Sequence, residues 1–218
     1  MNAADNYHRD NKMTQIKVKI DQKKGEISVW NNGQGLPVQM HATEKIYVPE
    51  LVFGHMLTSS NYDDSVKKVT GGRNGFGAKL TNVFSKKFTI TTADSKRGKL
   101  FTQTFKNNLS SIGEPSIKEF DKDKFDYTEV SFQPDFAKFK MKELDNDTVK
   151  LLSKRVIDLA GVTAASVKVY LNGTKVKVDN FKQYCEMYIG SDKEPFRVHD
   201  HNEKWDVCVS VAPGGVGR

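Results

Sequence analysis

The most constraining feature of this chain is a glycine-rich run that leads into a helix-forming segment. Four glycines fall within residues 71–77, and Ala78, Lys79 and Leu80 continue the run. Glycines let backbone N–H groups approach an anion without a Cβ in the way, and a helix that begins there points its positive dipole end at the same place. The run therefore predicts a phosphate-binding loop to which Lys79 adds charge. Taken alone, it is also compatible with a plain turn.

Two further segments, at residues 30–37 and at the start of the chain, carry asparagine side chains that are candidates for binding a ligand. Residues 30–37 follow a short apolar strand and place Gly33 and Gly35 behind Asn31. An asparagine offers a donor and an acceptor, which suits the edge of an adenine ring, although Asn-Gly is also common in tight turns. Near the start of the chain, Asn2 and Asn6 are four residues apart, on one face of a helix, where side-chain oxygens can reach a metal ion.

The order of these segments carries more information than any one of them. Asn-Ala-Ala-Asp at residues 2–5, Asn-x-Gly-x-Gly at 31–35 and Gly-Gly-x-x-Gly-x-Gly at 71–77 resemble the three boxes of the GHKL ATPases. Residues 30–33, 47–51, 57–64 and 70–75 are similar to those of the eukaryotic type IIA DNA topoisomerases, and the resemblance extends from residue 2 to about residue 211. It implies a two-layer GHKL (Bergerat) sandwich that binds ATP with Mg²⁺. The enzyme it implies is a nuclear homodimer that passes one DNA duplex through a double-strand break.

The resemblance also assigns roles to individual residues. Asn2 would bind Mg²⁺, and Asn6 would reach a phosphate or the metal shell. Asn31 would hydrogen-bond the adenine amino group with a bridging water, and Thr128 would lie beneath the adenine. The other implied nucleotide contacts are Gly33 and Gly35 in the second box, Ser59, Ser60 and Asn61 for ribose and phosphate oxygens, and Gly72, Arg73, Asn74, Gly75, Phe76, Gly77, Ala78 and Lys79 around the triphosphate.

The same resemblance places the catalytic groups outside the sequence. The family's general-base glutamate would stand four residues before Asn2, upstream of Met1, while the transducer lysine and the DNA-cleaving tyrosine would follow Arg218. We therefore expect ATP binding with poor hydrolysis. One alternative is a nucleic-acid-binding module that works without nucleotide. A second is another GHKL branch, which residues 30–32 and 58–64 disfavour.

Composition is compatible with this interpretation without deciding it. The net charge is +7 with 34 Lys plus Arg, which favours anionic partners such as nucleotide or DNA, but the basic residues are spread along the chain. The two cysteines, Cys185 and Cys208, lack the spacing of a metal motif, and a disulfide between them stays open. No apolar run reaches the ~20 residues of a membrane span, and no secretory signal is expected at the start.

Hydrophobic periodicity predicts an α/β fold. Strands are expected near residues 16–20, 27–30, 88–92, 100–105 and 128–132, with a hairpin around Asn172-Gly173-Thr174. Helices are expected from Pro49, over 76–84 with Leu80, Val83 and Phe84 inward, and from Asp145 or Asp147 to a stop at Gly161. The expected domains are a GHKL ATP-binding domain at 1–178 and the beginning of a transducer domain at 179–218. The latter would hold a helix near 181–189, a polar loop at 190–202 and a strand near 205–209.

Overall fold

The computed structural model describes residues 1–55, 75–190, 197–202 and 205–211. Its centre is a nine-stranded sheet in the order β5-β4-β3-β7-β2-β1-β8-β9, with β6 also paired to β4. Only the β1–β8 pair is parallel. The expectation of a largely antiparallel mixed sheet is therefore confirmed. The strands are β1 (Gln15–Asp21), β2 (Glu26–Asn31), β3 (Ser85–Asp94), β4 (Lys99–Lys106), β5 (Ser111–Ile112), β6 (Ser116–Glu119), β7 (Tyr127–Pro134), β8 (Lys168–Leu171) and β9 (Thr174–Lys175).

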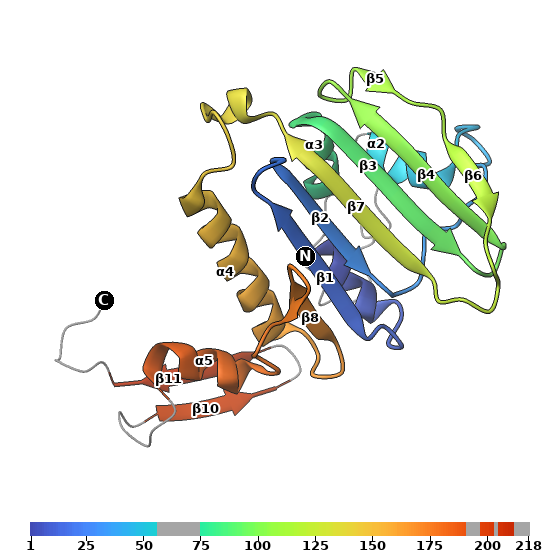
Figure 1. Cartoon of the computed structure of the whole chain (residues 1–218). Helices are drawn as coiled ribbons and strands as arrows, with labels where there is room; N and C mark the ends of the chain where they lie inside the picture. The colour runs from blue at the N-terminus through green and yellow to red at the C-terminus, as the bar shows by residue number, and fades with distance from the viewer. Residues whose placement is uncertain (56–74, 191–196, 203–204, 212–218) are drawn as a thin grey trace.

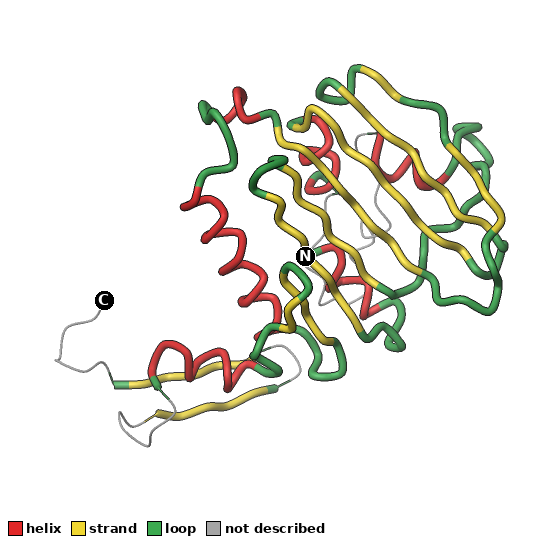
Figure 2. The backbone as a smooth tube through the Cα atoms, in the orientation of Figure 1, coloured by secondary structure: helices red, strands yellow, loops and turns green. Residues whose placement is uncertain are grey.

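Helices cover one face of this sheet, and the other face is open (Figures 1 and 2). The helices are α1 (Asn2–Asp5), α2 (Val48–Gly54), α3 (Gly77–Val83), α4 (Asn146–Val162) and α5 (Phe181–Ile189), with 3₁₀ turns η1 (Asn6–His8) and η2 (Phe136–Phe139). Alternation along each strand decides which side chains are covered, because successive residues point to opposite faces. In β1, Ile16, Val18 and Ile20 are buried while Lys17 and Lys19 are exposed.

The covered face holds two apolar clusters. One joins α4 to β1 and β2, and includes Ile16, Ile27 and Val156. The other joins α2 to β3 and β4 and is mainly aromatic, with Phe53 against Phe88 at a ring-centroid distance of 5.9 Å and Phe88 against Phe105 at 6.1 Å. The polar residues described below lie between these clusters, on the same face.

Two expectations about the helices are corrected. Gly161 does not end α4, which continues to Val162. A Cβ at residue 161 would lie 2.7 Å from Cβ of Tyr184, so glycine there allows α5 to pack closely against α4. In α3, Leu80 and Phe84 are exposed instead of inward, and the buried residues are Lys79 and Asn82.

The last part of the described chain forms a separate small unit of sheet. β10 (Arg197–His201) and β11 (Asp206–Ser210) pair in antiparallel fashion, and α5 contacts them. The helix at 181–189 and the strand near 205–209 were expected, but residues 197–201 were expected to be loop. They were missed because Val198 is the single apolar residue in that strand. The division into domains at residues 178 and 179 stays a prediction.

Candidate functional site

The site begins with three polar residues that lie side by side on neighbouring strands. Asn31 at the end of β2 pairs with Thr128 of β7, and Thr128 pairs with Thr92 of β3. Residues paired in this way share one face of a sheet. Thr92 is fully buried and Asn31 is 5% exposed, while the Thr92 and Thr128 hydroxyls are 3.0 Å apart. This row places a hydrogen-bonding surface where the apolar face of the sheet is interrupted.

The side chain of Asn31 is held in one orientation. Its Oδ1 accepts from Asn6 Nδ2 at 2.9 Å and from the backbone N–H of Gly33 at 3.1 Å. Because a backbone N–H only donates, the atom that it meets on Asn31 is the oxygen. Asn6 Nδ2 also donates to the carbonyl of Gln34 at 3.1 Å. Because a backbone carbonyl only accepts, the Asn6 atom that meets it is the nitrogen, and the orientation of this amide is fixed as well. Within the described residues, no acceptor faces Asn31 Nδ2, so this group is the available donor of the site.

The loop after β2 runs close to its neighbours, and glycine makes this possible. A Cβ at residue 33 would lie 2.5 Å from Asn6 Nδ2, and one at residue 35 would lie 1.8 Å from the carbonyl oxygen of Ala93. The Gly35 N–H donates to Asp126 Oδ2 at 3.2 Å. Gly33 and Gly35 thus have a packing reason to be glycine, whether or not they touch a ligand.

Thr92 and Asp126 were not expected from the sequence. The hydroxyl of Thr92 accepts from Leu36 N at 2.9 Å, and Asp126 Oδ1 accepts from Ser95 N at 2.7 Å, so both hold the loops around Asn31. A signal for Thr92 was present, because it continues the alternation of Phe88 and Ile90 on the buried face. A polar residue at a buried strand position needs a hydrogen-bond partner. Asp126 lies in a polar turn and gave no such signal.

The two amides of the first box differ in exposure. Asn2 is exposed at the start of α1, whereas Asn6 is 8% exposed and turned toward Asn31. The α-helix ends at Asp5 and the chain continues as the 3₁₀ turn η1, but Asn6 keeps right-handed helical backbone angles and its N–H donates to the Asn2 carbonyl, so the two residues are one helical turn apart. Asn6 therefore supports Asn31, and the exposed residue Asn2 carries an amide oxygen, a hard donor of the kind that Mg²⁺ takes.

The end of the glycine-rich run is described from Gly75 onward. Gly75 has a φ of +68°, and Lys79 is 2% exposed with its ammonium donating to the Gly75 carbonyl at 2.9 Å. Burial lowers the pKa of Lys79. A Cβ built at Gly77 meets no atom of the described residues within 4 Å, so none of them crowds this position in the first turn of α3. The ammonium of Lys79 thus lies near the start of α3. Of the neighbouring residues, Phe76 is exposed and Ala78 is half-buried.

Six of the expected site residues lie outside the described part of the chain: Ser59, Ser60, Asn61, Gly72, Arg73 and Asn74. The structure brings Asn6, Asn31, Gly33 and Thr128 together, as the resemblance implies. No helix among the described residues is long and apolar enough to cross a membrane.

Comparison with protein families places this arrangement among known ATPases. Residues 1–109 match the family described as Histidine kinase-, DNA gyrase B-, and HSP90-like ATPase. The chain belongs to this ATPase family. The matched half contains the amide pair Asn6 and Asn31, the loop with Gly33 and Gly35, and Lys79, whereas Thr128 follows it along the sequence.

Curated relatives agree with the resemblance found from the sequence. The chain is 50% identical to DNA topoisomerase 2 of Arabidopsis thaliana over 98% of its length, and 50% identical to human DNA topoisomerase 2-beta over 99%. It spans 15% and 13% of these two proteins. The similarity to type II topoisomerases is thereby confirmed for this region.

Solved structures give the same result for the fold. The ATPase region of Saccharomyces cerevisiae topoisomerase II superposes with a TM-score of 0.92 at 46% identity, over 97% of this chain and 56% of that one. The ATPase and transducer domains of DNA topoisomerase II from Balamuthia mandrillaris give 0.91 at 43% identity, over 98% and 54%. The GHKL sandwich expected from the sequence is confirmed.

Proposed function

We propose that this chain is the ATP-binding region of a type II DNA topoisomerase and that it holds ATP together with Mg²⁺. The observation that carries the proposal is the buried Asn6–Asn31 amide pair beside the Thr92–Thr128 row, in a chain of an ATPase family. A locked amide with one available donor is suited to reading the edge of a base. The relatives' names supply the DNA-topoisomerase part of the proposal.

Asn31 meets the adenine through a bridging water in this proposal. Its Oδ1 already accepts two hydrogen bonds, whereas the adenine amino group is a donor. A water oxygen can accept from both Asn31 Nδ2 and the amino group, and therefore joins two donors that cannot bond to each other. Thr128, paired with Asn31 across the strands, contributes the neighbouring hydroxyl.

The triphosphate would lie toward the start of α3. The open space at Gly77 and the buried ammonium of Lys79 fit an anion there, because backbone N–H groups and a fixed positive charge both attract phosphate. Asn2 would hold Mg²⁺ through its exposed amide oxygen. When bound, Mg²⁺ neutralises part of the phosphate charge. The segments 59–61 and 72–74 complete the set of proposed contacts.

The proposal for the whole enzyme goes further than this region. It is a nuclear homodimer that uses ATP to pass one DNA duplex through a double-strand break in another, and residues 179–218 begin its transducer domain. Supporting observations are the relatives' names and the separate β10–β11 sheet, which α5 links to the ATPase part. The net charge of +7 suits a partner such as DNA.

Thermal unfolding with added nucleotide tests the ATP site. We expect a rise in melting temperature that saturates with ATP and Mg²⁺, because a ligand that binds only the folded state stabilises it by mass action. GTP should give a smaller shift, since guanine presents a carbonyl where adenine presents an amino group. A shift produced by DNA and abolished by salt, with none from ATP, would instead support a nucleic-acid-binding module.

Asn31 variants test how the base is read. Asn31→Ala removes the amide and should weaken ATP binding by roughly 1–3 kcal/mol. Asn31→Asp keeps an acceptor for Asn6 and Gly33 but replaces the donor Nδ2 by an oxygen, which can accept directly from the adenine amino group. ATP binding should therefore survive in Asn31→Asp, with discrimination against GTP retained. Equal ATP affinity of Asn31→Ala and the parent chain, measured by calorimetry, would exclude Asn31 from the site.

A further inference from the structure

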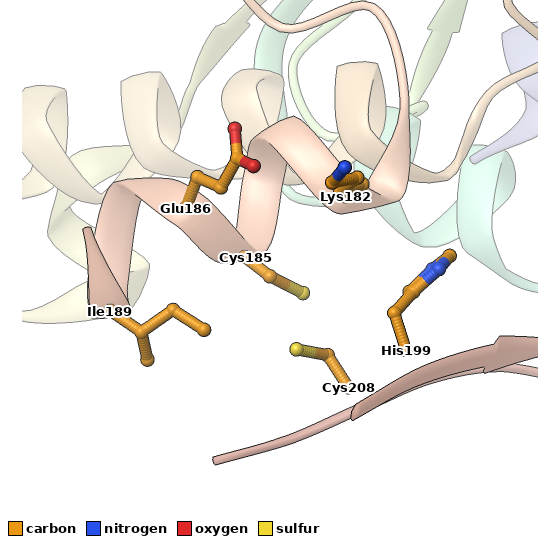
Figure 3. A pocket seen from close by; sticks show the side chains of 6 residues that line it. All are labelled: Lys182, Cys185, Glu186, Ile189, His199 and Cys208. Carbon is orange, nitrogen blue, oxygen red and sulfur yellow. The ribbon is translucent and has the colours of Figure 1, made fainter. Parts of the chain in front are cut away.

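A second cluster of reactive side chains lies far from the proposed nucleotide site, between α5 and the β10–β11 hairpin. A cavity of about 240 Å³ separates the helix from the two strands. Figure 3 shows its lining, which comprises Lys182, Cys185, Glu186, Ile189, His199 and Cys208. Both cysteines of the chain are in it, both half-buried and both free thiols. The proposed function uses none of these groups.

The local structure explains why the two cysteines meet. Residues 182, 185, 186 and 189 are three or four apart, so they form one face of α5. On β11, Cys208 is half-buried between Val207 and Val209, which are 44% and 64% exposed and point to the opposite face. His199 of β10 pairs directly with Cys208 and therefore shares its face. The two cysteine faces thus oppose each other across the cavity.

The sulfur atoms of Cys185 and Cys208 point toward each other in this view (Figure 3). Cys208 is one of the groups that raise the pKa of Cys185. Within the described residues, no group of three or more His, Cys, Asp and Glu side chains is arranged to hold a metal ion. His199, the nearest candidate for a third ligand, is instead engaged with Asp206 at 2.6 Å. The arrangement favours chemistry between the two thiols over metal binding.

We propose that Cys185 and Cys208 form a redox modification site, in which a peroxide or a small-molecule disulfide oxidises the two thiols to a disulfide that links α5 to β11. With hydrogen peroxide, one thiolate attacks the peroxide, an S–O bond forms, the O–O bond breaks and water is released. The second thiolate then attacks that sulfur, the S–S bond forms, and the departing hydroxide is protonated to a second water. The two thiols lose two electrons and two protons in total, and one peroxide becomes two waters.

The surroundings set the pH dependence of this reaction. Burial, the hydrogen bond with Cys208 and the negative charges of Asp206 and Glu186 raise the pKa of Cys185 to about 11. Lys182 on α5 and His199 on β10 also line the cavity. Since the thiolate is the reactive form, Cys185 reacts faster as the pH rises.

The consequence of the disulfide is a covalent link between two elements that otherwise only pack together. Cys185 and Cys208 close a loop that contains β10 and the turn before β11. A crosslink of this kind stabilises the folded state, chiefly by restricting the unfolded chain. Oxidation should thus fix the position of the hairpin relative to α5 without touching Asn31 or Lys79.

Equilibration with reduced and oxidised glutathione tests the proposal. We expect the folded chain to lose the mass of two hydrogen atoms, and peptide mapping without reductant to join residues 185 and 208. The disulfide-to-dithiol ratio at equilibrium should be at least ~10-fold higher in the folded chain than in guanidinium-unfolded chain, because folding already holds the thiols together. A lower or equal ratio in the folded chain, or single glutathione adducts as the main product, would overturn the proposal.

Single-cysteine variants provide the controls. Cys185→Ser and Cys208→Ser should give no intramolecular disulfide, and their melting temperatures should not change with oxidant, whereas that of the parent chain should rise. Cys185→Ala and Cys208→Ala replace them if the buried hydroxyl prevents folding, which circular dichroism reports. A parent chain that oxidises with no rise in melting temperature, or a variant that shows the same rise, would contradict the assigned link between α5 and β11.

Discussion

At the scale of single residues, the glycines of the candidate site divide into two kinds. Gly35 lies against a strand, with the Ala93 carbonyl oxygen where its Cβ would be, whereas Gly77 faces open space at the start of α3. A backbone atom cannot move aside as the end of a flexible side chain can. Internal packing thus requires glycine at residue 35, whereas at residue 77 no contact with the described residues requires it.

Matched alanine substitutions test this difference. Gly35→Ala should lower the free energy of unfolding by about 1–3 kcal/mol or more, because the loop must move away from β3. Gly77→Ala should leave stability unchanged or slightly raised, since alanine favours a helix, yet weaken ATP binding if the phosphates pass close to this residue. Urea denaturation and calorimetry measure the two quantities. Equal stability of both variants would show that the Gly35 contact is relieved without cost.

At the scale of elements, strong periodicity was enough to find most of the sheet and its longest helix. The side chain of Asp145 accepts from Thr148 N at 2.7 Å, which is the helix start expected from the sequence. Local sequence patterns failed to predict secondary structure where contacts with residues distant in sequence determine it. Gly161 resembles a glycine that ends a helix, but it allows Tyr184 to pack closely against α4. The polar strand β10 forms because β11 pairs with it. Strand pairing and helix packing are tertiary effects that no short window of sequence contains.

The junction of α4 and α5 gives a prediction at this scale. The Tyr184 hydroxyl donates to Asp158 Oδ1 at 2.8 Å, and Asp158 also accepts from Lys154 at 2.9 Å. The hydrogen bond with Tyr188, burial and the bond to Asp158 raise the pKa of Tyr184 to about 12. Because this folded-state value lies above the ordinary value of 10.0, the stabilisation is complete below pH 10 and is lost as the pH rises toward 12.

Tyr184→Phe should therefore lower the free energy of unfolding by about 1 kcal/mol at neutral pH and reduce the loss of stability in the alkaline range. Tyr170→Phe on β8 is the matched control, because no hydrogen bond of its hydroxyl is found among the described residues. Urea denaturation at neutral and alkaline pH measures both variants. An alkaline loss of stability as large in Tyr184→Phe as in the parent chain would assign the effect to other groups.

At the scale of the whole molecule, the candidate site is assembled from segments that are distant in sequence. Asn6 follows α1, Asn31 ends β2, Thr92 lies on β3 and Thr128 on β7, and the order of strands brings them together. Asn6, Asn31 and Thr128 were predicted as site residues from the sequence motifs and the family resemblance. Thr92 and Asp126 support them through contacts that depend on sheet order, which explains why the supporting residues were missed and the motif residues were not.

The proposed nucleotide site has a consequence for turnover, because the groups expected to bind ATP and those expected to hydrolyse it lie in different parts of the sequence. The proposed adenine and phosphate contacts lie within residues 1–218, but the resemblance places the general base before Met1 and the transducer lysine after Arg218. General-base assistance is worth roughly 10²–10⁴-fold in rate, and a cation at the γ-phosphate adds electrostatic stabilisation. A polypeptide limited to residues 1–218 should therefore bind ATP and hydrolyse it at or near background.

Phosphate release from purified 218-residue chain, measured beside ATP binding, tests this expectation. An extended chain that carries the upstream glutamate and the complete transducer domain should recover turnover. The same extended chain with glutamine in place of that glutamate should bind ATP without hydrolysing it. Lys79→Ala excludes a contaminating ATPase, because a contaminant is indifferent to this change. Robust hydrolysis by residues 1–218 that Lys79→Ala abolishes would mean that the attacking water is activated by a group inside the chain, and the assignment of the general base to an upstream glutamate would then be wrong.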